Sequence, residues 1–211
     1  HIKNISSLLL EDVYGPLTKE QKWGVKVIFE KVQEAIDVTN LYLSVAELEA
    51  GHAIISKEKT DLVQLVKEQI KKILYGANQK GIEVITELQK DLPKIRVDAE
   101  KIGTVFYTIL DNGVKYSPQN GKLFINLKKL ENKYILFSCQ DSGIGLSKEE
   151  ISELGKIPYQ RSKRARSAHG TGIGLALYLS NLIIRGHGAE LWAESEGHGK
   201  GTTFNVKIPI D

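Results

Sequence analysis

The first fifty residues carry apolar side chains at the spacing of an α-helix. These side chains recur every three or four positions, as on one face of a short helix, at Ile2, Ile5, Leu9 and Val13. Gly15 and Pro16 should end this helix, because glycine is a poor helix former and proline lacks the amide hydrogen. Thr18, followed by Gln21 three residues later, is a capping-box signature for a second helix. The pattern therefore predicts a helical hairpin.

A longer apolar stripe continues along the second helix to Gly51. Its members alternate spacings of three and four, as in the seam of a helix bundle, at Val25, Ile28, Val32, Ala35, Thr39, Tyr42 and Ala46. A helix of about 30 residues spans roughly 45 Å, so the short first helix alone cannot cover this stripe. The stripe could pack onto the rest of its own chain. Pairing with a second copy is more economical and would give a dimeric four-helix bundle.

Residues 52–211 alternate predicted strands and helices. Strands are expected over 53–59, 82–88, 121–130, 132–139, 189–195 and 202–208. Helices are expected from Asp61 to Gly76, from Asp98 to Tyr116, after Ser147 and after Gly172. The chain should therefore form two domains, 1–51 and 52–211. The fold class is α+β, with helices layered on one face of a sheet in the second domain.

Composition and charge narrow the class of protein. The 211 residues are 41% hydrophobic and 26% charged, which supplies enough apolar material for a packed core. A formal net charge of +3 is too small to argue for nucleic-acid binding. The single cysteine, Cys139, excludes a disulfide within the chain and agrees with a reducing compartment. No apolar run approaches the length that a bilayer span needs, and no signal peptide is visible.

Three short motifs follow one another at intervals of roughly 30 residues. They are T-I-L-D-N-G-V-K-Y-S-P over 108–118, D-S-G-I-G over 141–145 and G-T-G-I-G-L over 170–175. Glycine tolerates positive φ and lets backbone N–H groups approach a ligand, so a glycine-rich turn that opens a helix suits a phosphate chain. Each cluster alone is weak evidence, because such turns are common. Their order and spacing together are a strong signal.

The three motifs resemble the N, G1 and G2 boxes of the ATP-binding domain of bacterial sensor histidine kinases. That family shares its two-layer α/β sandwich, the GHKL or Bergerat fold, with the Hsp90, gyrase B and MutL ATPases. The likeness includes the ending H-G-A-E-L-W-A-E-S-E-G-H-G-K-G-T-T-F over 187–204. The resemblance implies a protein-histidine kinase that binds ATP with Mg²⁺. It would pass the γ-phosphoryl to a histidine, for relay to an aspartate of a response regulator.

The resemblance assigns roles to residues of the first two motifs. Asn112 is at the position that holds Mg²⁺, Lys115 supplies a charge for phosphate, and Tyr116 borders the pocket. Asp141 matches the adenine reader, because a carboxylate accepts from the exocyclic amine of adenine. Gly143 and Gly145 should permit the backbone bends beside it. The plainer alternatives are a surface Asn and Lys at a helix end, and a tight turn capped by an aspartate.

The second glycine cluster and the segment before it should complete the site. Arg161 opens R-S-K-R-A-R, which resembles the mobile lid over ATP, and Arg161 or a neighbour could meet the γ-phosphate. Alone, such a run indicates a nucleic-acid patch or a solvated loop. The positive end of the following helix suits phosphates. Nucleotide contacts are expected at Gly170, Thr171, Gly172, Gly174 and Leu175.

Two departures from the family pattern bear on catalysis. Thr108 stands where the kinases usually have a second Asn, or the ATPase relatives a Glu, so no catalytic residue is assigned. Gly155 and Pro158 stand where the family usually has two phenylalanines. Both departures slightly favour the alternative of a non-catalytic nucleotide-binding dimeric scaffold. An Hsp90-type hydrolase is less favoured, because no glutamate occupies position 108.

The hairpin shares the resemblance. V-Y-G-P-L-T-K-E-Q over 13–21 looks like the loop of the kinases' dimerisation domain, and A-E-L-E-A-G over 46–51 looks like its end. The family's acceptor histidine lies well before the pair that matches Ile2-Lys3, so we expect it upstream of this chain. The chain starts at His1 without methionine, which indicates a fragment or a processed form. His1 as acceptor, or as a tag remnant, is the alternative. A cytoplasmic homodimer that binds a response regulator is expected, with any membrane anchor upstream.

Overall fold

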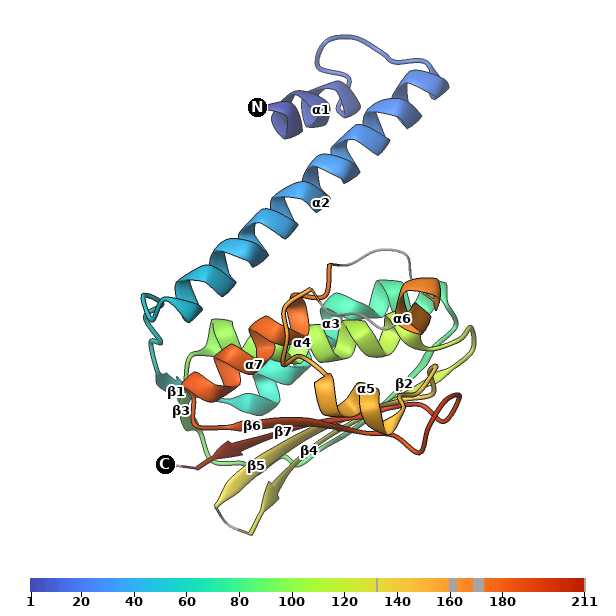
Figure 1. The fold of residues 1–211 in the computed structure, drawn as a ribbon. Coiled ribbons are helices and arrows are strands. Elements are labelled where there is room, and N and C mark those ends of the chain that lie inside the picture. Colours follow the sequence, from blue (N-terminus) through green and yellow to red (C-terminus); the bar gives the residue numbers. More distant parts are fainter. Residues whose placement is uncertain (132, 160–162, 169–172, 211) are drawn as a thin grey trace. The chain divides into compact units, whose positions relative to one another are not determined.

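The computed structural model describes residues 1–131, 133–159, 163–168 and 173–210. It divides into two compact units, His1–Ala46 and Glu47–Asp211 (Figure 1).

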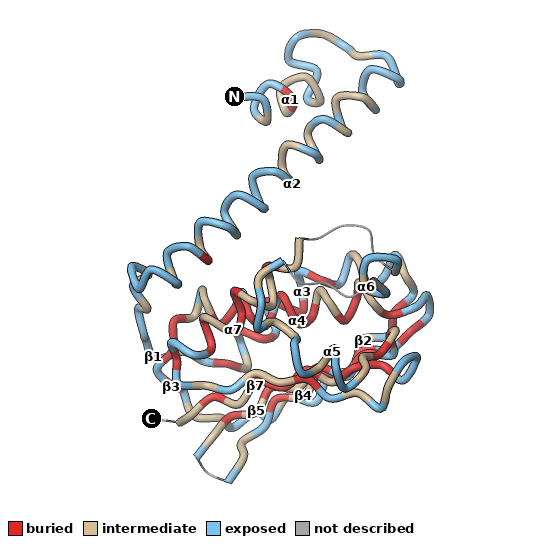
Figure 2. The backbone as a smooth tube through the Cα atoms, in the orientation of Figure 1, coloured by how far each residue is buried: buried red, intermediate tan, exposed pale blue. Residues whose placement is uncertain are grey.

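The first unit holds helix α1 (Ile2–Leu10) and most of helix α2 (Lys19–Glu49). The predicted capping box is confirmed. The Thr18 N–H donates to Oε1 of Gln21 at 2.9 Å, and the Gln21 N–H donates to Oγ1 of Thr18 at 3.2 Å. Most residues of this unit are exposed or only half-buried (Figure 2). The exposed ones include large apolar residues, among them Ile5, Trp23, Ile28, Tyr42 and Leu43. A helical pair with so much exposed apolar surface has little core of its own.

The second unit is built on a mixed five-stranded sheet in the order β2-β4-β5-β7-β6. Its strands are β2 (Glu83–Leu88), β4 (Lys122–Leu130), β5 (Tyr134–Asp141), β6 (Glu190–Glu194) and β7 (Thr203–Pro209). Strand β2 runs parallel to β4, and the other neighbours are antiparallel. The predicted β4–β5 hairpin is confirmed, with Leu130 opposite Tyr134 and Leu123 opposite Asp141.

Three helices cover one face of this sheet (Figure 1): α3 (Leu62–Gln79), α4 (Ala99–Tyr116) and α7 (Ala176–Gly186). Two short helices, α5 (Lys148–Glu153) and α6 (Lys163–Ala168), lie in the segment before α7. The core lies between the helices and the sheet. Its centre contains Phe106 of α4 and Phe137 of β5, whose ring centroids are 4.4 Å apart. The α+β fold class with helices on one sheet face is therefore confirmed.

One predicted strand is shorter than expected. The pattern over 53–59 gives only β1 (Glu58–Thr60), because its antiparallel partner β3 (Ile95–Val97) offers three residues for pairing. Strand β3 was not predicted. It is too short to show an alternating pattern. The helix after the second glycine cluster begins at Ala176, with Leu175 as its N-cap.

Candidate functional site

Asp141 is the last residue of β5, and its side chain is buried, with 7% of the residue exposed. Its Oδ1 accepts two backbone hydrogen bonds, from the Gly143 N–H at 2.7 Å and from the Thr202 N–H at 3.1 Å. The other oxygen, Oδ2, makes no hydrogen bond to another described residue. Burial raises the pKa of Asp141 to about 6, and the two N–H donors act in the opposite direction. Two backbone hydrogen bonds thus fix Oδ1 in place, while Oδ2 has no partner among the described residues.

The glycines beside Asp141 are required by close backbone approach. Gly145 has φ +65°, and a Cβ there would collide with the carbonyl oxygen of Gly197. The N–H of Gly199 donates to the carbonyl of Ile144 at 2.7 Å, and the N–H of Gly201 donates to that of Gly143 at 3.2 Å. The loop between β6 and β7 is therefore bound along the D-S-G-I-G turn.

Ser195 reinforces this pairing of loops from the end of β6. Its Oγ accepts from the N–H of Leu146 at 3.1 Å and donates to the carbonyl of Gly201 at 2.6 Å. Neither Ser195 nor Thr202 was predicted as a site residue. The G-K-G-T-T-F ending belongs to the resemblance, but no local spacing connects Thr202 with a carboxylate 61 positions earlier.

Asn112, Lys115 and Tyr116 lie in the last two turns of α4, and all three are half-buried. The end of α4 adjoins the D-S-G-I-G turn, because a Cβ on Gly143 would lie 2.6 Å from the carbonyl oxygen of Tyr116. The structure thus brings the first two motifs together. The side-chain amide of Asn112 makes no hydrogen bond to another described residue. Its oxygen is a hard, neutral donor of the kind that Mg²⁺ prefers.

Lys115 is engaged within its own helix. Its ammonium pairs with Oδ2 of Asp111 at 2.5 Å, four residues earlier. The charge of Lys115 is therefore paired with a carboxylate of its own helix in this structure.

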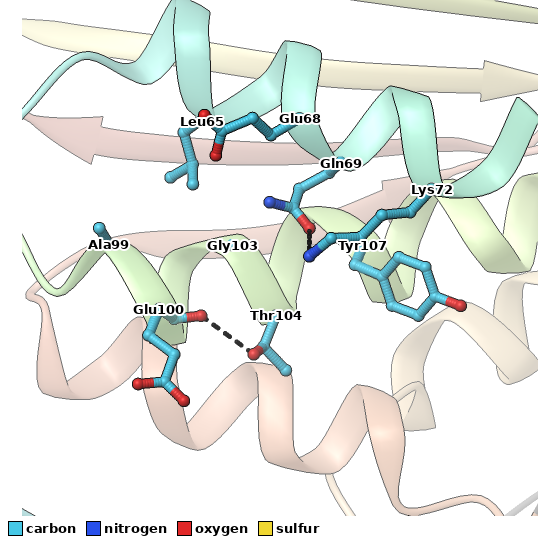
Figure 3. Close-up of a pocket in the computed structure, with 9 residues that line it drawn as sticks. All are labelled: Leu65, Glu68, Gln69, Lys72, Ala99, Glu100, Gly103, Thr104 and Tyr107. Carbon is cyan, nitrogen blue, oxygen red and sulfur yellow. Dashed lines mark hydrogen bonds between the residues drawn. The ribbon is translucent and has the colours of Figure 1, made fainter.

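Thr108 and Thr104 occupy different surroundings from Asn112. Thr108 is buried, at 8% exposed, one turn before Asn112. Thr104 is exposed, donates to the carbonyl of Glu100 at 3.0 Å, and lines a separate groove between α3 and α4 (Figure 3). This groove, of about 530 Å³, is lined by Leu65, Glu68, Gln69, Lys72, Ala99, Glu100, Gly103, Thr104 and Tyr107. It contains none of the predicted site residues.

Part of the predicted site lies outside the described residues: Arg161, Gly170, Thr171 and Gly172. Of the rest, Gly174 has φ +77°, and Leu175, only 1% exposed, is the N-cap of α7. The segment before α6 explains one departure from the family pattern. Nδ2 of Asn181 donates to the carbonyl of Gly155 at 2.8 Å, and a Cβ on Gly155 would lie 2.5 Å from that nitrogen. Gly155 also has φ +62°, so a larger side chain at this position would strain the backbone and require the Asn181 amide to move.

The second unit is thus a two-layer α/β domain. At one end of its sheet, the buried carboxylate of Asp141 lies beside a glycine-rich turn. Residues 97–211, more than half of the chain, match the family model described as "Histidine kinase-, DNA gyrase B-, and HSP90-like ATPase". The chain belongs to that family. The resemblance to the ATP-binding core of sensor histidine kinases is therefore confirmed.

Named relatives agree with this assignment. Sporulation kinase E of Bacillus subtilis (strain 168) is 29% identical over 184 residues, which is 87% of this chain and 23% of that protein. The chain thus spans about a quarter of the length of such curated relatives. A crystal structure of full-length ShkA in complex with AMPPNP has the same fold, with a TM-score of 0.82 and 20% identity, over 99% of this chain and 43% of that one.

A second similar solved structure is that of histidine kinase ThkA in complex with response regulator protein TrrA. The match covers 100% of this chain and 57% of the chain in that structure. Its TM-score is 0.66 at 17% identity, which shows a shared fold. None of the helices within the described residues combines the length and apolar character that a membrane span requires.

Proposed function

We propose that this chain is the catalytic core of a sensor histidine kinase that binds Mg-ATP. The observation that carries the proposal is the geometry of Asp141. Two backbone donors orient Oδ1, and Oδ2 has no partner among the described residues. An oriented carboxylate oxygen would accept from the exocyclic amine of adenine and would repel the carbonyl oxygen that guanine has there.

Asn112 would hold Mg²⁺ through its amide oxygen, with the remaining ligands from phosphates and water. When bound, Mg²⁺ would neutralise charge on the phosphates. Lys115 would add a cation beside the phosphates after release from Asp111. Arg161 and the glycine cluster of 170–175 are proposed to contact the phosphates of the nucleotide.

The proposed reaction is phosphoryl transfer in two steps. A neutral imidazole nitrogen attacks the γ-phosphorus, the bond to the β–γ bridging oxygen breaks, and ADP leaves with that electron pair. A carboxylate oxygen of a response regulator then attacks the phosphorus, and the P–N bond breaks to return the histidine. The protein contributes positioning and charge neutralisation. The complex of the similar kinase ThkA with a response regulator supports a receiver domain as the partner. The use of ATP and of such a partner favours a cytoplasmic location for the core.

Single-turnover labelling with γ-labelled ATP tests this function. The experiment compares this chain with a longer version that carries the upstream helix. Acid-labile label on the longer version alone supports the kinase and an acceptor histidine upstream of His1. Label on this chain that His1→Ala abolishes would make His1 the acceptor. Bound nucleotide without label supports the scaffold, which the Thr108 departure favours, and released phosphate supports a hydrolase.

We also propose that residues 1–51 are the dimerisation hairpin and residues 52–211 the catalytic domain. The exposed apolar side chains of α1 and α2 support a second copy as the cover of this surface. Removing residues 1–51 should leave a monomer that still binds ATP. Sedimentation velocity measures the oligomeric state. A dimer that persists after truncation would locate the interface in the second unit.

A further inference from the structure

Lys80 reaches across from the end of α3 to the end of α4. Its ammonium donates to three carbonyl oxygens there: those of Val114 at 2.9 Å, Lys115 at 2.7 Å and Ser117 at 3.3 Å. The last carbonyls of an α-helix have no partner within the helix. Lys80 therefore donates hydrogen bonds to carbonyl oxygens at the end of α4 that cannot be bonded within the helix.

The charge of Lys80 suits this position. The carboxyl end of a helix carries partial negative charge, which a cation offsets. Lys115 is the basic residue in the last turn of α4, but its ammonium is paired with Asp111. Lys80 is half-buried, and burial lowers its pKa. The ammonium of Lys80 donates to all three carbonyl oxygens and so places a positive charge at this end of the helix.

Backbone contacts connect the same two turns. The carbonyl of Lys80 accepts from the N–H of Asn120 at 2.8 Å, and the N–H of Glu83 donates to the carbonyl of Gly121 at 2.9 Å. Gly81, between them, has φ +64° and lies against the Asn120 side chain. The turn after α3 and the turn after α4 are therefore held together beside the end of α4.

We propose that Lys80 is a positioning residue of the nucleotide site. By binding the carbonyls of the last turn of α4, it fixes the direction of the turn that carries Lys115 and Tyr116 toward the D-S-G-I-G loop. Asp141 lies on β5 and is not held by Lys80. This inference rests on the proposed function, and it separates the phosphate side of the site from the adenine side.

Calorimetry on the full chain tests this separation with two ligands, Mg-ATP and adenosine. Lys80→Met keeps the aliphatic stem and removes the ammonium. We expect the Kd for Mg-ATP to rise about 5–10-fold, while that for adenosine changes less than about twofold. Lys80→Arg should restore affinity for Mg-ATP. The matched control is Lys71→Met, because Lys71 is exposed on the same helix and makes no hydrogen bond or ion pair with any described residue.

Hydrogen exchange gives a readout that needs no nucleotide. In Lys80→Met the Ser117 amide, bonded to the Gly113 carbonyl at the end of α4, should exchange about tenfold faster. The Ile102 amide, bonded to the Asp98 carbonyl at the start of α4, should change much less. Should Lys80→Met fail to fold, Lys80→Gln removes the charge with a smaller loss of hydrogen bonding.

Three results would overturn the positioning role: unchanged affinity for Mg-ATP, equal losses for Mg-ATP and adenosine, or uniformly faster exchange along α4. If the unaltered chain binds no ATP, the proposed function fails. The exchange rates at Ser117 and Ile102 then still decide whether Lys80 orders the end of α4.

Discussion

The backbone N–H of Asp98 donates to Nε2 of His187 at 3.0 Å, across 89 positions of the sequence. Nδ1 of the same ring lies 2.8 Å from the carbonyl of Ile183. Because Nε2 accepts, the proton is on Nδ1 and the ring is neutral. Asp98 is the N-cap of α4, and His187 is the C-cap of α7. This hydrogen bond therefore connects the start of α4 with the end of α7, the two helices that flank the proposed site.

This arrangement predicts a pH-dependent loss of stability. Burial of His187 lowers its pKa below the ordinary value of 6.5, so the unfolded state binds the proton more readily. The stabilising contribution of the neutral ring is present above pH 6.5 and is lost as the pH falls below it. The difference in melting temperature between the unaltered chain and His187→Gln should shrink between pH 7.5 and pH 5.5.

The control for this effect is His52→Gln, which changes an exposed histidine. Only the pH dependence that His187→Gln shows in excess of His52→Gln is assigned to His187. A constant difference for His187→Gln would contradict the predicted titration. Comparing variants at each pH removes the opposite contribution of Asp141, whose raised pKa favours the folded state as the pH falls below about 6.

Asp141 predicts a second pH effect, on nucleotide affinity. With a pKa of about 6, the carboxylate is protonated in acid and loses its charge. Affinity for ATP should therefore fall about tenfold between pH 7 and pH 5. Asp141→Asn should cost roughly 1.5–3 kcal/mol at pH 7, or about tenfold or more in Kd.

Calorimetry with ATP and GTP at both pH values measures these effects. In Asp141→Asn, the pH dependence of the affinity reflects the titration of the nucleotide's own phosphates. Any additional pH dependence of the affinity in the unaltered chain is therefore assigned to Asp141. Equal affinity for ATP and GTP, or full affinity in Asp141→Asn, would contradict the assignment of Asp141 to adenine.

Gly145→Ala should be strongly destabilising for the site loop. Gly145 and Gly188 have similar backbone conformations, with φ +65° and +67°. A Cβ at Gly145 would collide with the Gly197 carbonyl, whereas a Cβ at Gly188 meets no atom within 4 Å. Both alanine variants carry the same left-handed strain. Gly145→Ala should lose about 1–3 kcal/mol more in urea unfolding, because its loops must separate. Equal losses would show that the loops adjust without cost.

Thr108 yields a prediction about rate. Thr108→Asn restores the usual side chain of the kinases, and we expect faster phosphoryl transfer with less than about twofold change in ATP affinity. Thr108 is 8% exposed, so the larger amide must displace its neighbours. Thr108→Val, which keeps the shape and removes the hydroxyl, is the control and should be no faster. Both rates are measured in longer chains that carry the acceptor histidine. Matched rates for Thr108→Asn and the unaltered protein would show that the position is neutral.

Local chemistry explains why several element boundaries were predictable. Helices begin after Asp61, Asp98 and Ser147 because each side chain accepts from the N–H three residues later. These contacts lie within one turn, so their spacing is visible in the chain. Strand β3 could not be predicted, because its three residues form a strand only by pairing with β1.

Periodicity and motifs of fixed spacing were enough to predict the helical hairpin, the alternation of strands and helices, and the candidate residues from Asn112 to Leu175. The groups that hold those residues in place became visible only in the folded chain. Thr202 reaches Asp141 across 61 positions, and Lys80 reaches the end of α4 across 34 to 37. Contacts between segments far apart in the chain leave no spacing pattern, because the fold alone brings their hydrogen-bonding groups within reach.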